Sequence, residues 1–307
     1  MKKYILFLLI AFIMTGCEDK SPIVTIPDVE FKKILLIRYD LNNDGEISVK
    51  EASKIRELDV SGSQVKSGEI TSLNGIENFT ELKVLDCSCN KLITIDVSNN
   101  VELTDLLCFD NTLTSLDVSK NIKLRKLSCS RNIIPELDVS KNVLLETLFC
   151  YINQLTELDV TNNTNLKYFS CSFNQIDELD VSKNLQLLKF FCNDNKLTIL
   201  DVSSHKKLQI LYCYNNMLTT LDVTNNPDLT ILGLHGNQLS EIDLSKNIEL
   251  GELSCSENNI TQMDVSNNPK LYRFLCRNSP ELKTIIMKNN QEIKQFRKNT
   301  ESTIVYR

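Results

Sequence analysis

The sequence has no tryptophan and only two histidines among its 307 residues, and it is poor in glycine and proline. Only His205 and His235 are available, and this argues against a multi-histidine zinc site and against histidine-based catalysis. The net charge of -6 and the acidic pI of about 5.2 argue against a general nucleic-acid binder. An apolar share of 42% and a charged share of 24% fit a folded, water-soluble body. We therefore expect no nucleic-acid partner.

Long hydrophobic runs are also missing, and the one short run lies at the N-terminus. Tyr4–Met14 is apolar throughout, follows two lysines and is too short for a membrane helix, but it has the length of a signal-peptide core. Thr15-Gly16 then leads to Cys17. This arrangement resembles the bacterial lipoprotein signal, in which the cysteine is lipidated and becomes the first residue after cleavage. We expect residues 1–16 to be a lipoprotein signal peptide; the alternative is a plain secretory peptide.

An acidic cluster, Glu18-Asp19-Lys20, follows the lipidation site at Cys17. It is similar to the surface-export signal of Bacteroidetes lipoproteins, although a solvated tether would have the same composition. Residues 17–27 contain two prolines and are expected to form that tether. The predicted location is the outer membrane or the cell surface, with the membrane contacted through the lipid anchor.

A calcium-loop pattern lies between residues 40 and 51, which read DLNNDGEISVKE and match every position of the EF-hand motif. Gly45 allows the sharp turn, and a helix is expected before the loop and a short one from Glu51 to Ile55. Residues 28–57 are thus an EF-hand-like segment with one calcium ion, expected to be structural and of weak affinity (~10⁻⁴ to 10⁻³ M) because no second hand is present. An acidic turn that binds no ion is the alternative. The expected oxygen ligands are Asp40, Asn42, Asp44, Glu46 through its carbonyl, Ser48 through water, and Glu51.

From Leu82 the chain repeats every 21 residues, and ten units cover residues 82–291 with the consensus LxxLxCxxNxLxxLDVSxNxx. This consensus is similar to leucine-rich repeats. The resemblance implies a right-handed solenoid with a curved parallel β-sheet and an extended or 3₁₀ outer face. Because end units must shield the core, residues 58–81 are expected to be an N-terminal cap and residues 292–307 a C-terminal cap.

The residues at one position of the repeat form a column, and the residue type of each column can be explained physically. Positions one, four and six are expected to point into the core, and the asparagine at position nine to pair with backbone groups where the chain leaves the sheet. The aspartate of LDVS is expected to accept hydrogen bonds from the residue two positions later. A calcium-binding row of carboxylates is the alternative for these aspartates.

The 11 cysteines divide into Cys17, a column of nine and Cys89. Leu234 occupies the same column in the eighth unit, so the column accepts a small-to-medium apolar group, and buried cysteine behaves as one. We expect free, buried thiols there, and we expect Cys89 to be more exposed and more reactive. The column consists of Cys87, Cys108, Cys129, Cys150, Cys171, Cys192, Cys213, Cys255 and Cys276.

Positions three, five and seven are expected to face outward from the concave sheet, and several aromatic residues occupy them in the central units. Exposed aromatic patches often mark binding surfaces, although strands also favour aromatic residues on either face. The expected ligand-binding residues are Phe109, Phe149, Tyr151, Tyr168, Phe191, Tyr212 and Tyr214.

The combined features resemble a family of Bacteroidetes leucine-rich-repeat surface lipoproteins. The resemblance implies surface display and binding without an established enzymatic activity. We therefore predict a monomeric, non-catalytic protein that binds a protein or peptide on the concave face. A glycan-binding lipoprotein and a structural envelope protein without a discrete ligand are the alternatives. An enzyme is not expected, because His235 beside Cys213 or Ser256 offers the one candidate nucleophile site and Cys213 is expected to point into the core.

Overall fold

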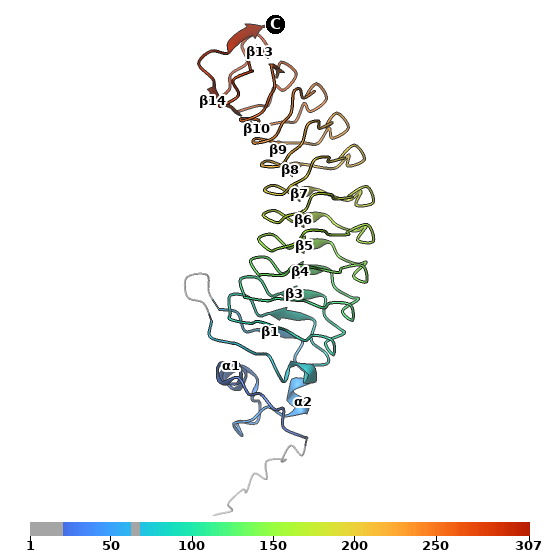
Figure 1. Cartoon of the computed structure of the whole chain (residues 1–307). Coiled ribbons are helices and arrows are strands. Elements are labelled where there is room, and N and C mark those ends of the chain that lie inside the picture. The colour runs from blue at the N-terminus through green and yellow to red at the C-terminus, as the bar shows by residue number, and fades with distance from the viewer. Residues whose placement is uncertain (1–20, 63–67) are drawn as a thin grey trace, which may run out of the picture.

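The computed structural model describes residues 21–62 and 68–307, in which the chain coils into a long solenoid (Figure 1). The predicted signal peptide, Cys17 and the first residues of the tether lie outside these ranges. Within the described ranges, no helix has both the length and the apolar character needed to cross a membrane.

Two short helices precede the solenoid: α1 (Val29–Tyr39) and α2 (Val49–Ala52). The side chain of Asp28 caps α1 by accepting the Phe31 N–H at 3.0 Å. The second helix differs from the prediction, because it begins at Val49 and ends at Ala52. Its earlier start follows from a capping box, in which the Ser48 hydroxyl accepts the Glu51 N–H and the Glu51 carboxylate accepts the Ser48 N–H.

The N-terminal segment closes one end of the solenoid at the edge strand β1 (Glu57–Asp59). Arg38 donates to the Asp59 carbonyl at 2.6 Å, and the Tyr39 hydroxyl donates to the Glu57 carbonyl at 3.0 Å. The short 3₁₀ helix η1 (Ile76–Asn78) follows, and the end core is sealed by a Phe31–Phe79 stack. An open strand edge would present unpaired backbone groups, so α1 protects this end of the sheet.

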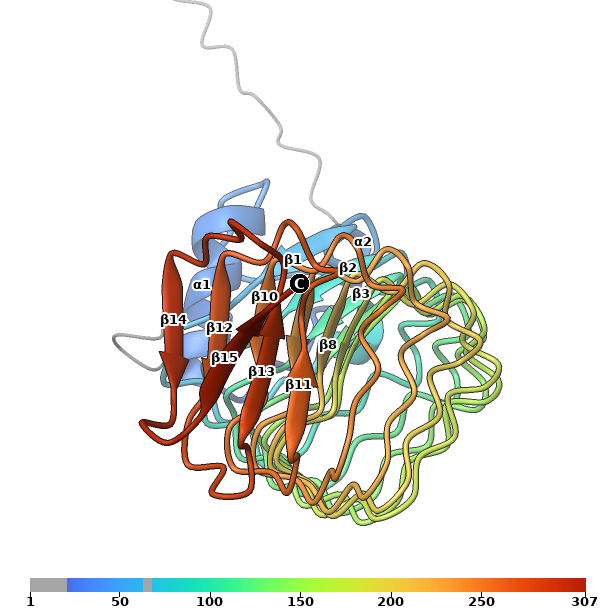
Figure 2. The same cartoon turned by 90° about the horizontal axis from the view of Figure 1, so that it is seen from above.

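A parallel sheet of twelve strands runs along the described part of the chain, and each strand pairs in register with the strand of the next turn (Figure 2). The 21-residue repeat sets this register, because equivalent residues of successive units are Cα partners, as with Leu85 and Leu106. After β1 the sheet contains β2 (Val84–Asp86), β3 (Asp105–Leu107), β4 (Lys126–Ser128), β5 (Thr147–Phe149), β6 (Tyr168–Ser170), β7 (Lys189–Phe191), β8 (Ile210–Tyr212), β9 (Ile231–Gly233), β10 (Glu252–Ser254), β12 (Arg273–Cys276) and β14 (Gln295–Lys298).

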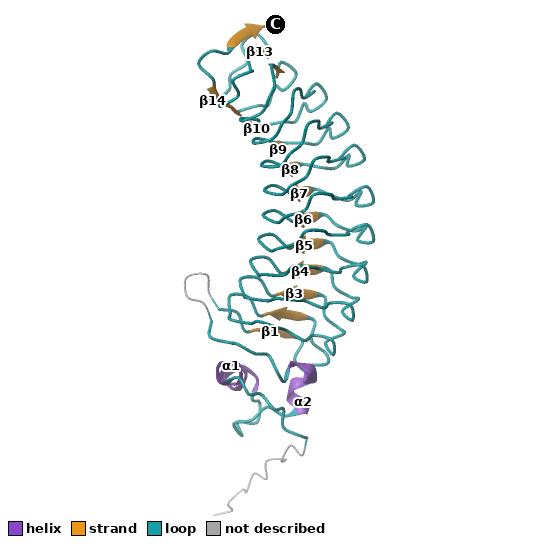
Figure 3. Cartoon of the chain, in the orientation of Figure 1, coloured by secondary structure: helices purple, strands orange, loops and turns teal. Residues whose placement is uncertain are grey.

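The outer side of the repeats consists of extended segments and turns (Figure 3). Bonds from residue i+3 to residue i close these turns, as from the Asn121 N–H to the Val118 carbonyl, without forming a 3₁₀ helix in residues 82–291. Near the C-terminus the outer segments pair into a three-stranded parallel sheet of β11 (Gln262–Asp264), β13 (Thr284–Met287) and β15 (Thr303–Tyr306). A Phe274–Phe296 stack fills the core beneath the last turns.

The core follows the predicted columns. Position one, four and six side chains such as Leu82, Leu85 and Cys87 are fully buried, and the valine of LDVS is buried as well. Phenylalanine replaces leucine at position four in two adjacent turns, where Phe169 and Phe190 stack with ring centroids 5.3 Å apart. The buried side chains of the described residues therefore form one continuous hydrophobic core that runs along the solenoid axis.

The asparagines at position nine satisfy the backbone where each strand ends. The Asn132 amide oxygen accepts the Leu113 N–H at 2.9 Å, and its amide nitrogen donates to the carbonyls of Cys108 and Cys129. The same pattern recurs from turn to turn. This column therefore joins successive turns by side-chain to backbone bonds, as predicted.

A second buried asparagine column, at position 19, was not predicted. Asn163, for example, donates to the carbonyls of Val139 and Asn142 in the preceding turn. His205 takes this place in one turn and makes a single contact of 3.0 Å from Nε2 to the Val181 carbonyl. The other members of the column are Asn100, Asn121, Asn142, Asn184, Asn226, Asn247 and Asn268.

Candidate functional site

The cysteine column is part of the core. Each of the ten cysteines in the described ranges is free and buried. Burial raises the pKa of the Cys213 thiol to about 12, so this group stays protonated at neutral pH and cannot act as a nucleophile. The expectation for Cys89 is wrong, because its side chain is only 5% exposed and burial, followed by the nearby Asp110 carboxylate, raises its pKa.

The aspartates of LDVS build turns, as predicted. Asp159 accepts the Thr161 N–H at 2.8 Å and the Thr161 hydroxyl at 2.7 Å. The hydroxyl bond and then the backbone bond lower the pKa of Asp159. In residues 21–62 and 68–307, no three His, Cys, Asp or Glu side chains form a group that could hold a metal ion.

In the predicted calcium loop, acidic side chains accept hydrogen bonds from the backbone of the loop itself. Asp40 accepts the N–H groups of Asp44 and Gly45 at 3.2 and 3.0 Å, and Asp44 accepts the Glu46 N–H at 2.9 Å. The positive φ of 83° at Gly45 explains why glycine occupies that position. At the end of the loop, the buried Glu51 carboxylate accepts the Leu41 N–H at 3.0 Å.

The donor chemistry of the loop suits calcium, since carboxylate, amide and carbonyl oxygens are its preferred ligands. The Glu46 carboxylate is paired with Lys32 at 2.6 Å, which leaves the Glu46 carbonyl for the role predicted from the sequence. Asn42 and Asp44 are linked through the Asn42 amide at 2.8 Å. These carboxylates are not drawn together into a three-residue cluster.

EF-hand loops usually pair with a second loop, and here the segment before α1 pairs with the predicted calcium loop instead. Ile23 pairs antiparallel with Ser48, the Val24 N–H donates to the Ile47 carbonyl at 2.8 Å, and the Val49 N–H donates to the Pro22 carbonyl at 2.8 Å. Ile47 is fully buried by this contact with the core. The segment before α1 therefore pairs with the loop in the way that a partner loop would.

On the exposed face of the sheet, four aromatic side chains come together in consecutive turns. Ring centroids are 5.3 Å apart for Phe191 and Tyr212, 5.7 Å for Tyr212 and Tyr214, and 4.3 Å for Tyr214 and His235, where the rings stack. We call these four residues the aromatic row. Burial raises the pKa of Tyr214, which keeps its hydroxyl protonated.

The other predicted aromatic residues share the face but not the row. Tyr168 is exposed and has the Lys189 ammonium 5.9 Å from its ring centroid. Phe109, Phe149 and Tyr151 are half-buried, and among the ring contacts of the described residues none links them to the row. The structure thus gathers Phe191, Tyr212 and Tyr214 from the predicted set and leaves the other four apart.

A pocket of about 350 Å³ opens beside the aromatic row, and the sequence did not predict it. Gly233 contributes to this space, because it has no side chain where the two preceding turns carry Phe191 and Tyr212. A Cβ at this glycine would lie 2.9 Å from the Tyr212 ring, so Tyr212 leans over the backbone of β9. We call this the sheet pocket; its lining residues are Tyr212, Tyr214, Ile231, Leu232, Gly233, His235, Glu252, Leu253, Ser254, Arg273 and Leu275.

The polar groups of the sheet pocket lie on its C-terminal side. Arg273 pairs with Glu252 at 3.0 Å, and the Tyr272 hydroxyl also donates to Glu252. His235 Nδ1 is 3.3 Å from the Ser254 hydroxyl, and burial lowers the pKa of His235, so the imidazole is neutral at pH 7. An apolar pocket with aromatic walls and a few polar groups at one side is typical of a ligand-anchoring site.

Solved structures with the same architecture include InlJ from Listeria monocytogenes, described as containing a cysteine ladder. It is 30% identical with a TM-score of 0.72, and the match covers 91% of this chain and 69% of that one. InlF of the same organism is 21% identical with a TM-score of 0.68, covering 87% and 85%. A plant peptide hormone receptor, RGFR1 in complex with RGF2, is 21% identical with a TM-score of 0.56, covering 75% and 44%. No protein-family model and no curated protein matches the chain.

Proposed function

This chain belongs to the leucine-rich-repeat proteins, and from that premise we propose that it is a binding protein whose sheet face holds a protein or peptide. The observation that carries the proposal is the aromatic row beside the sheet pocket, in which Gly233 leaves room for one anchoring side chain. Buried aromatic anchors in pockets supply most of the energy in protein interfaces. That the plant receptor of the same fold is solved with RGF2 agrees with a peptide-sized occupant.

We propose no catalytic role. The Cys213 thiol, which lies nearest to a nucleophile arrangement with His235, is fully buried and protonated. The other partner, Ser256, accepts the Arg277 N–H at 3.0 Å, and the hydroxyl 3.3 Å from His235 Nδ1 belongs to Ser254. We therefore propose that the sheet face binds a ligand and does not catalyse a reaction.

Two further features complete the proposal. The N-terminal sequence supports a lipid anchor at Cys17 and display at the outer membrane or cell surface. The loop from Asp40 to Glu51 is proposed to hold one structural calcium ion, which would stiffen the segment that covers β1. When bound, the ion supplies a charge that joins oxygen ligands from both ends of the loop.

Changing Phe149, Tyr151, Phe191 and Tyr212 together to serine is expected to lower partner capture by about tenfold or more, because the anchoring rings are lost. The measurement is quantitative capture of surface proteins from intact cells by the purified, immobilised chain. The matched control changes four exposed apolar residues away from this face to serine: Ile93, Ile122, Val143 and Ile248. Undiminished capture by the aromatic variant would show that the sheet face is not the binding surface.

A glycan is the second candidate occupant, since aromatic faces also stack on sugars; the exposed Tyr168 ring favours it. A glycan array probed with the wild-type chain and the aromatic variant separates the two. Binding to a defined glycan that disappears in the variant, without any protein captured from cells, would replace the protein proposal by the glycan one.

A further inference from the structure

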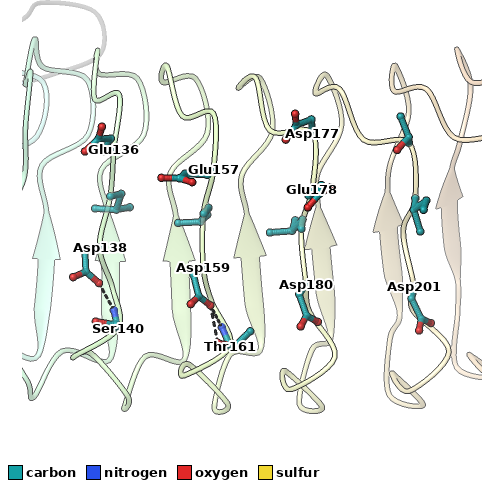
Figure 4. A pocket seen from close by; sticks show the side chains of 15 residues that line it. Glu136, Asp138, Ser140, Glu157, Asp159, Thr161, Asp177, Glu178, Asp180 and Asp201 are labelled. Atoms are coloured by element: carbon teal, nitrogen blue, oxygen red, sulfur yellow. Dashed lines mark hydrogen bonds between the residues drawn. The ribbon is translucent and has the colours of Figure 1, made fainter.

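A second surface feature lies across the core from the strands, where the outer segments of four consecutive turns form a groove of about 850 Å³ (Figure 4). Its floor is apolar and consists of Leu137, Leu158 and Leu179, with the strongly exposed Ile199 at one end. We call this the outer groove. At a repeat spacing of about 4.8 Å, four turns match an extended peptide of about four to five residues.

Two rows of carboxylates border this apolar floor. The first row belongs to the turns described above and is fixed by the repeat: Asp138, Asp159, Asp180 and Asp201. The second row is not fixed by the repeat, because the position of its three glutamates carries Thr94, Ser115 and Thr220 in other turns, and three consecutive turns carry glutamate only here. It consists of Glu136, Glu157, Asp177 and Glu178.

The second row has no charge partner, although glutamates elsewhere on the repeats do. Glu102 pairs with Lys123, Glu249 with Lys270, and Glu146 with both Lys167 and Arg125. For Glu136, Glu157, Asp177 and Glu178, the described residues contain no hydrogen-bond or ion-pair partner, and no basic side chain lines the groove. Lys141 and Lys183 lie on the turns beside the first row. The pKa values of Asp138 and Asp180 are lowered first by hydrogen bonds from Ser140 and Ser182 and less by these lysines.

These features indicate which kind of ligand the outer groove can bind. The described carboxylates of the two rows are spread along four turns and do not form a group of three, an arrangement that matches an extended chain of positive charges. Nucleic acids and anionic lipids would be repelled. Lysine and arginine side chains combine apolar stems, which can lie on the leucine floor, with charged heads that reach the carboxylates.

We infer that the outer groove binds an extended, lysine- or arginine-rich peptide segment of a partner protein. This surface is separate from the sheet pocket, so either surface can fail its test without the other. The positive segment would lie along the solenoid axis between the two carboxylate rows. Binding would weaken with ionic strength, because exposed charges are screened over about 10 Å at 0.1 M salt.

The test uses fluorescein-labelled hexalysine and measures its fluorescence anisotropy with the full chain at low salt. Changing Glu136, Glu157 and Glu178 to glutamine is expected to weaken binding about fivefold to tenfold, since each exposed pair contributes modestly. The matched control changes Glu241, Glu281 and Glu301 to glutamine. Glu241 occupies the same repeat position as the groove glutamates, and this triple variant alters the net charge by the same amount. All six side chains are exposed, so both variants are expected to fold.

The inference is supported if the groove variant loses affinity and the control variant stays within about twofold of the wild type. Equal losses in both variants would attribute binding to overall charge and would overturn it. Spermine provides the second arm: if it displaces hexalysine at the same concentration of positive charge, the groove is a polyamine site and the peptide assignment is wrong. No binding of hexalysine at low salt would overturn the inference directly.

Discussion

Replacing Asn132 with alanine is expected to lower the free energy of unfolding by about 3 kcal/mol, because a buried backbone N–H loses its partner and several hydrogen bonds disappear. In the folded chain the Asn132 amide oxygen is the acceptor for the Leu113 N–H, and its amide nitrogen donates to Cys108 and Cys129. All of these groups are shielded from water, so water cannot replace the missing amide. The truncated side chain also leaves a cavity, which adds to the cost.

The measurement is urea unfolding followed by circular dichroism. The control is Asn162→Ala, an exposed asparagine in a turn of the repeats, for which a change of less than about 0.5 kcal/mol is expected. Because each turn of a solenoid contacts only its neighbours, loss of the bond at Asn132 should also weaken the adjoining turns first. A cost at Asn132 no larger than that at Asn162 would contradict the role given to the position-nine column.

Calcium at about 10 mM is expected to raise the free energy of unfolding by about 1.4 to 2.7 kcal/mol, given an affinity of about 10⁻³ to 10⁻⁴ M. The reason is linkage: an ion that binds the folded loop and not the unfolded chain stabilises the folded state. The effect should reach the solenoid, because Arg38 and Tyr39 of α1 donate to the carbonyls of the edge strand β1. Thermal unfolding in calcium and in chelator measures it.

The control for the calcium prediction is Asp40→Ala. This variant is compared with itself in calcium and in chelator, so any direct effect of losing the Asp40 hydrogen bonds cancels. The calcium-dependent part of the shift is expected to vanish. An equal shift in the variant, or no shift in the wild-type chain, would remove the ion from the proposal and leave the loop as an acidic turn.

The repeat allowed much of the fold to be predicted from the sequence. Every twenty-first residue has the same surroundings, so Leu85, Cys87 and Asn90 could be assigned to the core and to the strand end from their columns alone. The turn role of the aspartates followed from the serine or threonine two residues later. In each case the physical reason is local or repeats from turn to turn, and a single sequence carries that information.

Features that depend on one turn or on distant segments were harder to predict. The sheet pocket exists because Gly233 lacks a side chain and Tyr212 leans into the space, which requires knowing the side-chain positions of two strands. The pairing of Ile23 with Ser48 joins segments that no pattern connects. Cys89 appeared exposed because it lies beyond the strand, but the neighbouring turn covers it. The available signal for the pocket was a glycine directly after two turns that carry the large Phe191 and Tyr212 at the same repeat position.

The most direct measurement of the binding role is surface-protein capture from intact cells by a chain with Gly233 changed to tryptophan. This change fills the sheet pocket and also pushes the Tyr212 ring aside, because a Cβ at Gly233 would lie 2.9 Å from that ring. The matched control is Leu107→Trp, at the same repeat position and far from the pocket. We expect the partner enriched by the wild-type chain to be lost with Gly233→Trp and kept with Leu107→Trp. Equal capture by all three chains would contradict the assignment of the sheet face as the binding surface.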